Sequence, residues 1–150
     1  MSVLATPGLA GRPINLLLVD DDELDVEIAM MALAEHGLDR RTEVKLDSLE
    51  ALDYLERMGR APRVVLLDLR MPRIDGFEML RRLRARGRYA YVPIVVVSSS
   101  QLDGDIAESY RLGANSFVRK RFGPDRPGSY LVDVVRYWLD LNEPAPGHSR

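Results

Sequence analysis

The stretch VVLLDLRMPRIDG, Val64–Gly76, decides the fold. It opens with four apolar residues, Val64 to Leu67, and runs directly into an acid, Asp68. An uninterrupted run of Val and Leu predicts a strand that is covered on both faces, as in a parallel sheet. The amphipathic stretch after Gly76 predicts a helix. A strand that ends in a carboxylate places it at the rim of the sheet, where open α/β sheets bind ligands.

The same alternation of strand and helix occurs five times. We expect strands at 14–19, 42–46, 64–67, 93–97 and 115–118, and helices at 24–36, 48–58, 77–86, 102–112 and 129–141. This pattern predicts an α/β fold: a doubly wound, five-stranded parallel sheet with helices on both faces and right-handed crossovers. The expected strand order is 2-1-3-4-5, with the binding crevice between the first and third strands.

Cap residues and apolar spacing predict how the helices lie. Asp22 with Asp25, and Asp75 with Glu78, have the spacing of capping boxes, and Ser48 is expected to cap the second helix. The residues of the second helix expected to face the core are Leu49, Leu52 and Leu55 or Met58. In the first helix the apolar residues at helical spacing are 24, 28, 31 and 32. The arginines at 81–88 are expected on the solvated face and C-terminal end of the third helix.

The composition predicts one globular domain. The chain has 150 residues, of which 46% are hydrophobic and 29% charged, and a net charge of −2, which gives no electrostatic case for binding nucleic acid. There is no cysteine, so disulfides and Cys-ligated metals are excluded. Neither a secretory signal nor an apolar run long enough for a membrane span occurs, and we expect a cytoplasmic protein. Pro and Gly predict a loose arm over 1–13 and a polar tail over 142–150, which leaves 14–141 as the domain.

Polar side chains follow four of the five predicted strands. Asp20 and Asp21 follow the first, Asp68 the third, Ser98 the fourth and Lys120 the fifth. Because parallel strands end at one edge of the sheet, these side chains should converge beside the crevice. Two carboxylates about 5 Å apart repel by roughly 3 kcal/mol at an effective dielectric of 20, so the cluster needs a cation. Carboxylates and water are the ligands of Mg²⁺.

Such a cluster is suited to phosphoryl chemistry. An Asp carboxylate can attack phosphorus and form an aspartyl-phosphate, while Mg²⁺ and Lys120 neutralise the phosphoryl charge and Ser98 donates to a phosphoryl oxygen. Lys120 stands out because 19 of the 21 basic residues are arginines. A solvated Lys120, and a turn or cap at Ser98, are the alternatives.

Four stretches carry a family resemblance: VDDDE at 19–23, LLDLRMPRIDG at 66–76, PIVVVSS at 93–99 and GANSFVRK at 113–120. Together they resemble the receiver domain of two-component response regulators over about 14–141. The resemblance implies a flavodoxin-like receiver fold and a phosphoacceptor switch rather than an enzyme. The phosphoryl donor in this family is a phosphohistidine on a sensor histidine kinase.

The resemblance also implies roles for single residues. These are Asp68 as the phosphoacceptor, Asp20, Asp21, Asp68 and the backbone carbonyl of Arg70 as Mg²⁺ ligands, and Ser98, Phe117 and Lys120 as the phosphoryl-stabilising and switch residues. The ring of Phe117 is expected to turn inward when the hydroxyl of Ser98 moves to the phosphoryl group. Arg121 departs from the family, which usually has Pro after the lysine, often with a cis peptide bond. A cis bond before a non-proline residue costs ~2.5–4 kcal/mol, so we expect a trans bond.

The 129–141 helix is apolar on much of its circumference. The residues that can face the core are Leu131, Val135 and Trp138 or Leu139. A second apolar stripe on the same helix consists of Tyr130, Val134, Tyr137 and Leu141, and Tyr110 of the preceding helix can join it. We expect this stripe to form a homodimer through the face of the fourth helix, fifth strand and fifth helix. An exposed aromatic rim without a partner is the alternative. The run ESYRLGANSFV at 108–118 and this helix resemble the stand-alone regulators that pair with bacterial phytochrome kinases.

Two other functions remain open. One is a constitutive interaction module with a receiver fold and no phosphoryl transfer, which Arg121 slightly favours. The other is a Mg²⁺-dependent aspartyl phosphatase. Such enzymes commonly carry a second Asp two residues after the nucleophile, where this chain has Arg70.

Overall fold

The computed structural model describes residues 15–121 and 126–146. Its strands are β1 (Leu16–Val19), β2 (Thr42–Lys45), β3 (Val64–Leu67), β4 (Ile94–Ser98) and β5 (Ser116–Arg119). They form one parallel sheet in the order β2-β1-β3-β4-β5, which confirms the expected fold class. The expected arm at 1–13, Ile14 of the first predicted strand and the tail beyond 146 lie outside the described residues.

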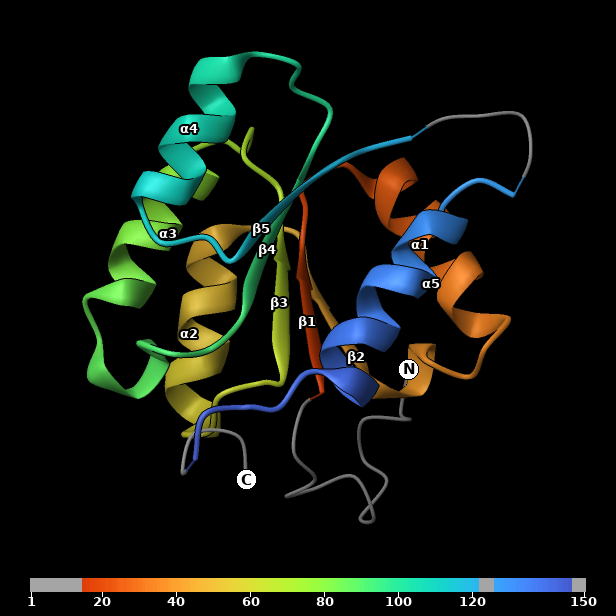
Figure 1. Ribbon diagram of the computed structural model, residues 1–150, viewed down its shortest axis with the longest axis horizontal. Helices are drawn as coiled ribbons and strands as arrows, with labels where there is room; N and C mark the ends of the chain where they lie inside the picture. The colour runs from red at the N-terminus through yellow and green to blue at the C-terminus, as the bar shows by residue number, and fades with distance from the viewer. Residues whose placement is uncertain (1–14, 122–125, 147–150) are drawn as a thin grey trace.

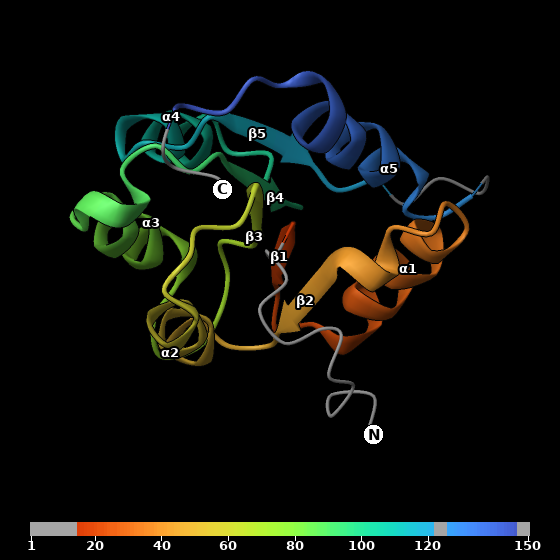
Figure 2. The ribbon, with the colours of Figure 1, turned by 90° about the horizontal axis from the view of Figure 1, so that it is seen from below.

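Helices cover both faces of the sheet. They are α1 (Glu23–Ala34), α2 (Ser48–Met58), α3 (Gly76–Arg84), α4 (Asp103–Arg111) and α5 (Ser129–Arg136), with short 3-10 turns η3 (Asp39–Arg41) and η4 (Gly87–Tyr89). α1 and α5 lie on one face, and α2, α3 and α4 lie on the other (Figure 1). Viewed from below, β5 runs along one edge between α4 and α5 (Figure 2). Among these helices none is both long and apolar enough to cross a bilayer.

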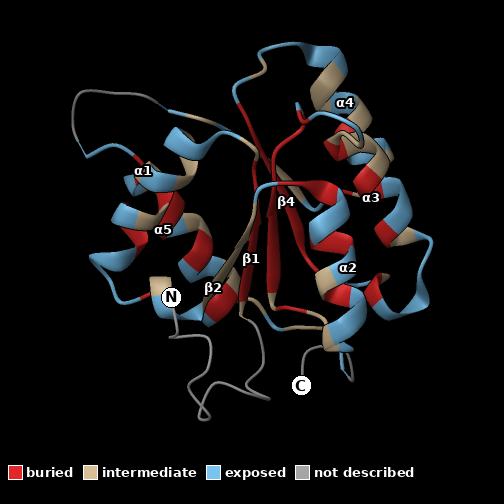
Figure 3. Ribbon diagram, turned by 180° about the vertical axis from the view of Figure 1, so that it is seen from behind, coloured by how far each residue is buried: buried red, intermediate tan, exposed pale blue. Residues whose placement is uncertain are grey.

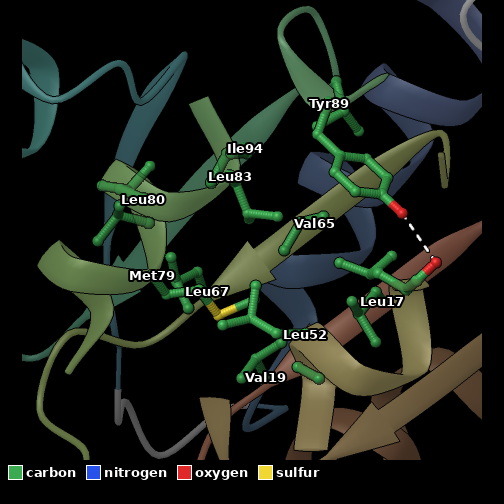
Figure 4. Packing of buried hydrophobic residues seen from close by; sticks show 14 of the residues in the cluster. Leu17, Val19, Leu52, Val65, Leu67, Met79, Leu80, Leu83, Tyr89 and Ile94 are labelled. Atoms are coloured by element: carbon green, nitrogen blue, oxygen red, sulfur yellow. Dashed lines mark hydrogen bonds between the residues drawn. The ribbon is translucent and has the colours of Figure 1, made fainter. Parts of the chain in front are cut away.

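The central strands are buried on both faces because both are covered by helices (Figure 3). In β1, Leu17 and Val19 point to the α2–α3 side, whereas Leu16 and Leu18 point to the α1–α5 side. On the α2–α3 side, strand residues pack against Met79, Leu80 and Leu83, and the buried Tyr89 hydroxyl donates to the carbonyl of Leu55 at 2.8 Å (Figure 4). Period-2 alternation therefore supplies two cores from one run of apolar residues.

The helix caps follow the sequence expectations in two of three places. Asp22 accepts from the N–H groups of Leu24 and Asp25, and Asp75 accepts from the N–H of Glu78. The expected Ser48 cap is wrong, because the extended residue before it, Asp47, accepts from the N–H of Glu50. Ser48 is instead the buried first residue of α2, and its hydroxyl lies 3.8 Å from the sulfur of Met71.

Two predicted helix faces, those of α1 and α2, also need correction. The outward-facing residues include Leu24 and Met31 of α1, each 65% exposed, and Leu49 of α2, 37% exposed. The buried face of α1 contains the expected Ala32 together with Ala29 and Leu33. Small residues there let α5 come close: a Cβ added at Gly128 would lie 3.0 Å from the carbonyl oxygen of Ile28 and 3.2 Å from the Cβ of Ala32. The face of α1 that is buried is therefore the one whose small residues allow close packing against α5.

The predicted 129–141 helix changes character near its end. α5 ends at Arg136, and a π-helical turn, η5 (Tyr137–Leu141), continues it. The carbonyl of Leu139 in this turn accepts a hydrogen bond from Arg63 at 3.0 Å. The buried residues of the segment include Leu131, Val135 and Leu139, as expected for the core stripe.

Arg84, at the end of α3, is half-buried rather than on the expected solvated face. Its guanidinium donates to the carbonyls of Gly113 at 3.0 Å, Tyr89 at 2.9 Å and Val92 at 2.8 Å. It also donates to the amide oxygen of Asn115 at 2.8 Å, which accepts from the N–H of Ile94 at 2.8 Å. Arg84 therefore ties α3 to the starts of β4 and β5.

Candidate functional site

The acidic residues meet where β1 and β3 end. The register pairs Val19 with Leu67, so Asp20 and Asp68 occupy equivalent positions at the carboxyl edge. The N–H of Asp68 donates to the carbonyl of Val19 at 2.9 Å, which continues the ladder to the site. One carboxylate oxygen each from Asp20, Asp21 and Asp68 lies within 4.8 Å of the others. Neighbouring strands thus bring the carboxylate of Asp68 to the adjacent pair Asp20 and Asp21, which lies far from it in the sequence.

Gly76 supports this loop, a contribution that the sequence reasoning missed. A Cβ at Gly76 would lie 2.3 Å from the carbonyl oxygen of Asp68 and 2.8 Å from the Cα of Leu69, distances that real Cβ atoms do not reach. Its N–H donates to the carbonyl of Leu69 at 2.9 Å. Only a residue without a side chain lets α3 begin this close to the backbone of Asp68.

The electrostatics favour a cation between the carboxylates. Burial raises the pKa of Asp68 to about 7, and the charges of Asp20 and Asp21 add to that rise against the opposing charge of Lys120. Burial also raises the pKa of Asp20, although the N–H of Asp22 and the ammonium of Lys120 oppose it. The ionised forms are therefore held at a cost, which a bound divalent ion would remove.

Lys120 reaches the cluster from the end of β5. Its Nζ atom lies 2.9 Å from Oδ2 of Asp20, 2.7 Å from Oδ2 of Asp25 and 3.6 Å from Oδ1 of Asp68. Burial lowers the pKa of Lys120, but the hydrogen bonds to Asp25 and Asp20 and the charge of Asp68 outweigh it, so the net pKa is raised and the ammonium stays charged. The Lys120–Arg121 peptide bond is trans, as expected.

The sequence analysis also missed the role of Asp25. Its carboxylate does not complete a capping box but hydrogen-bonds Lys120. The signal available was a further acid in the first turn of α1, four residues after Asp21. The contact of Asp25 with Lys120 could not be told from helix capping in the sequence, because both place an acidic residue at the start of α1.

The three carboxylates fit a small divalent cation, because hard oxygen donors are what Mg²⁺ and Mn²⁺ bind. The side chain of Arg70 pairs with Asp105 of α4, and the hydroxyl of Ser100 donates to the same carboxylate at 2.6 Å. These contacts link the β3–α3 loop to α4. A ligand role for the backbone carbonyl of Arg70 stays a prediction.

The two expected switch residues lie on neighbouring strands. Ser98 is buried at the end of β4, where its hydroxyl accepts from the N–H of Ser100 at 3.1 Å. Phe117 in β5 is half-buried and packs against the core of the α2–α3 side. Its N–H donates to the hydroxyl of Tyr110 at 3.1 Å, so a side chain of α4 binds the edge strand.

The expected interface stripe divides into two parts. Tyr130 and Val134 are partly buried against the core of the α1–α5 side. Tyr110, Tyr137 and Leu141 are exposed by 50%, 47% and 73% respectively. The homodimer expected from this stripe therefore depends mainly on residues of α4 and η5.

The chain is similar to known signalling proteins. Residues 16–129 match the family model of the response regulator receiver domain. The probable methanogenesis regulatory protein FilR2 of Methanothrix harundinacea (strain 6Ac) is 35% identical over 142 residues, which cover 92% of this chain and 91% of that protein.

Solved structures of response regulators share the fold. The phosphorylated cyanobacterial phytochrome response regulator RcpA has a TM-score of 0.79 at 27% identity, covering 89% of this chain and 99% of that one. The Mn²⁺-bound form of response regulator Rcp1 has a TM-score of 0.75 at 26% identity, with the same coverage. With the family model matching most of its length, the chain belongs to the response regulator receiver domain family.

Proposed function

We propose that this receiver domain is a signalling switch that accepts a phosphoryl group on Asp68 from a sensor histidine kinase. The observation that carries the proposal is the position of Asp68. Its carboxylate lies at the carboxyl edge of β3, with carboxylate oxygens of Asp20 and Asp21 within 4.8 Å and the ammonium of Lys120 at 3.6 Å. A nucleophile, a cation-binding pair and a fixed positive charge are thus in one place.

Each group has a chemical role in the transfer. An Asp68 oxygen attacks the phosphorus, the bond from phosphorus to the donor nitrogen breaks, and the histidine of the donor leaves with that electron pair. Lys120 neutralises charge that the arriving phosphoryl group brings. Asp20, Asp21 and Asp68 would hold Mg²⁺, which supplies further positive charge. The proposed Mg²⁺ requirement follows from the raised pKa of Asp68, since a nearby cation favours the ionised nucleophile.

The output side of the proposal concerns the α4–β5–α5 face. Ser98 and Phe117 lie on β4 and β5, between the site and this face. We infer that phosphorylation shifts both side chains and biases a homodimer in which Tyr110, Tyr137 and Leu141 take part. The structural similarity to RcpA, a phytochrome response regulator, supports a bacterial phytochrome kinase as the phosphoryl donor.

Incubation with acetyl phosphate and Mg²⁺, followed by intact-protein mass spectrometry, tests the proposal. We expect the mass of one phosphoryl group to be added to the wild type and not to Asp68→Asn. EDTA should suppress the addition. A wild type that gains no mass would contradict the proposed function and favour the constitutive interaction module. An Asp68→Asn variant that gains as much as the wild type would contradict Asp68 as the phosphoacceptor.

A further inference from the structure

We propose that Asp25 is a positioning residue that holds Lys120 away from Asp68 and thereby limits how fast Asp68 accepts a phosphoryl group. The inference rests on the proposed function and adds a residue to it. Of the three carboxylates around the ammonium, Asp25 is nearest at 2.7 Å, Asp20 follows at 2.9 Å and Asp68 is farthest at 3.6 Å. The last distance is beyond a hydrogen bond. The proposed phosphoacceptor is thus the one carboxylate of the three that forms an ion pair with Lys120 without a hydrogen bond.

Burial makes this competition matter. The side chains of Lys120, Asp20 and Asp68 are less than 10% exposed, and that of Asp25 is 20% exposed. Charge interactions at such positions are screened less than those of surface pairs. An ammonium has three donors, and two of them are already directed at Asp25 and Asp20. To approach an oxygen on Asp68, Lys120 has to weaken at least one of those bonds.

Asp25 can hold the lysine because a helix fixes its own position. It lies in the first turn of α1, and its N–H donates to the capping carboxylate of Asp22 at 3.1 Å. A small cavity of about 30 Å³ borders Asp25, Asp68 and Lys120, enough for about one water molecule. This space lets the ammonium shift toward Asp68 without repacking of the core. The hydrogen bond between Asp25 and Lys120 is therefore well positioned in the unphosphorylated protein, and it can break when the ammonium moves toward Asp68.

The charge balance acts in the same direction. Asp20, Asp25 and Asp68 place three carboxylates around one ammonium, Asp21 adds a fourth to the acidic cluster, and a phosphoryl group brings further negative charge. Replacing Asp25 by Asn removes one of these charges and also frees the ammonium for Asp68. Both changes favour an incoming phosphoryl group.

The experiment compares the initial rate of phosphorylation of wild type, Asp25→Asn and Glu27→Gln by acetyl phosphate with saturating Mg²⁺, read by intact mass. Glu27 is exposed on the same helix, so its variant loses the same charge without touching the site. We expect Asp25→Asn to be about fivefold faster than wild type, and Glu27→Gln to be unchanged. An unchanged or slower Asp25→Asn would overturn the inference while leaving the proposed function intact. An unlabelled wild type would overturn both.

A second measurement separates positioning from a general structural effect. In a Lys120→Ala background, Asp25→Asn should accelerate labelling much less, because the residue that it positions is gone and only the loss of one negative charge remains. An acceleration of the same size without Lys120 would overturn the inference. The sequence contains just two lysines, so lysine-selective ¹⁵N labelling follows the ammonium directly. The Lys120 signal should shift in Asp25→Asn and that of Lys45 should not; an unmoved Lys120 signal would contradict the contact itself.

Discussion

The two ends of the sheet hold their buried charges in opposite ways. At the amino end, one guanidinium, that of Arg84, donates to the carbonyls of Gly113, Tyr89 and Val92 and to the side chain of Asn115. At the carboxyl end, several carboxylates surround the single ammonium of Lys120. One end has a cation whose donors are met by neutral dipoles, and the other has an excess of negative charge.

This difference separates stability from function. The guanidinium of Arg84 binds acceptors from separate segments, so the cluster contributes to holding α3, β4 and β5 together. The carboxylates around Lys120 repel one another, and the raised pKa of Asp68 records the cost. Sites that bind ions and transfer charged groups are commonly destabilising in this way, because they are shaped for a charge that arrives later. The amino end should therefore be sensitive to loss of its charge, and the carboxyl end should tolerate it.

The largest effect is expected from Arg84→Ala. It removes the guanidinium donor from the half-buried carbonyls of Gly113, Tyr89 and Val92, and should lower the free energy of unfolding by about 3 kcal/mol. Urea denaturation followed by circular dichroism measures the change. The matched control is Arg82→Ala, which breaks a surface pair with Glu78 and should cost less than about 0.5 kcal/mol. Equal losses for both variants would remove the distinction drawn for Arg84.

A smaller loss is expected from Gly76→Ala at the carboxyl end, where backbone shape rather than charge is at stake. The added methyl would clash with the backbone of Asp68 and Leu69, so we expect about 2 kcal/mol of destabilisation and slower phosphorylation. Gly104→Ala is the control, because nothing lies within 4 Å of a Cβ there. As Gly104 lies in α4, its replacement should stabilise the protein by up to about 1 kcal/mol. A Gly76→Ala variant as stable as wild type would show that the β3–α3 loop can shift to accommodate the added methyl group.

The sequence was most informative where one local rule decides the outcome. Runs such as Val64–Leu67 predict buried parallel strands, and the residue after each strand must lie at the carboxyl edge, so the positions of Asp20, Asp68 and Lys120 followed from topology. The caps at Asp22 and Asp75 followed from spacing. These features depend on neighbours in the chain or on a fixed rule of sheet geometry.

What could not be predicted depends on contacts between distant segments. The partners of Arg84 come from two turns up to 31 residues away, so its position in the sequence predicts only a solvated helix end. Asp25 and Lys120 are 95 residues apart, and the sequence of neither segment predicts which carboxylate binds the lysine. The burial of Ala29 and Leu33 in place of Leu24 and Met31 depends on the close approach of α5.

The smallest effect, and the one of opposite sign, is expected from Asp68→Asn in metal-free protein. Burial raises the pKa of Asp68 to about 7 in the folded state, against about 4 in the unfolded chain. The stability that the protonated carboxyl contributes is thus fully present below pH ~4 and is lost as the pH rises through about 7. Asn does not ionise, so the variant keeps this stability at every pH. The free energies of unfolding of the variant and the wild type should therefore match near pH 4.

At pH 8 in EDTA the variant should be the more stable by about 1 kcal/mol, because the wild-type carboxylate is then ionised at a cost that the attraction of Lys120 offsets only in part. Urea melts of both proteins across this pH range measure the difference, with Asp133→Asn, an exposed site on α5, as the control that should show none. Mg²⁺ should reverse the order at pH 8, since it stabilises only a folded protein that retains all three carboxylates. An Asp68→Asn variant that is less stable than wild type at pH 8 without metal would contradict this comparison. The charges at the carboxyl end would then stabilise the fold, as Arg84 does at the amino end, and uncompensated charge could not explain the chemistry of the site.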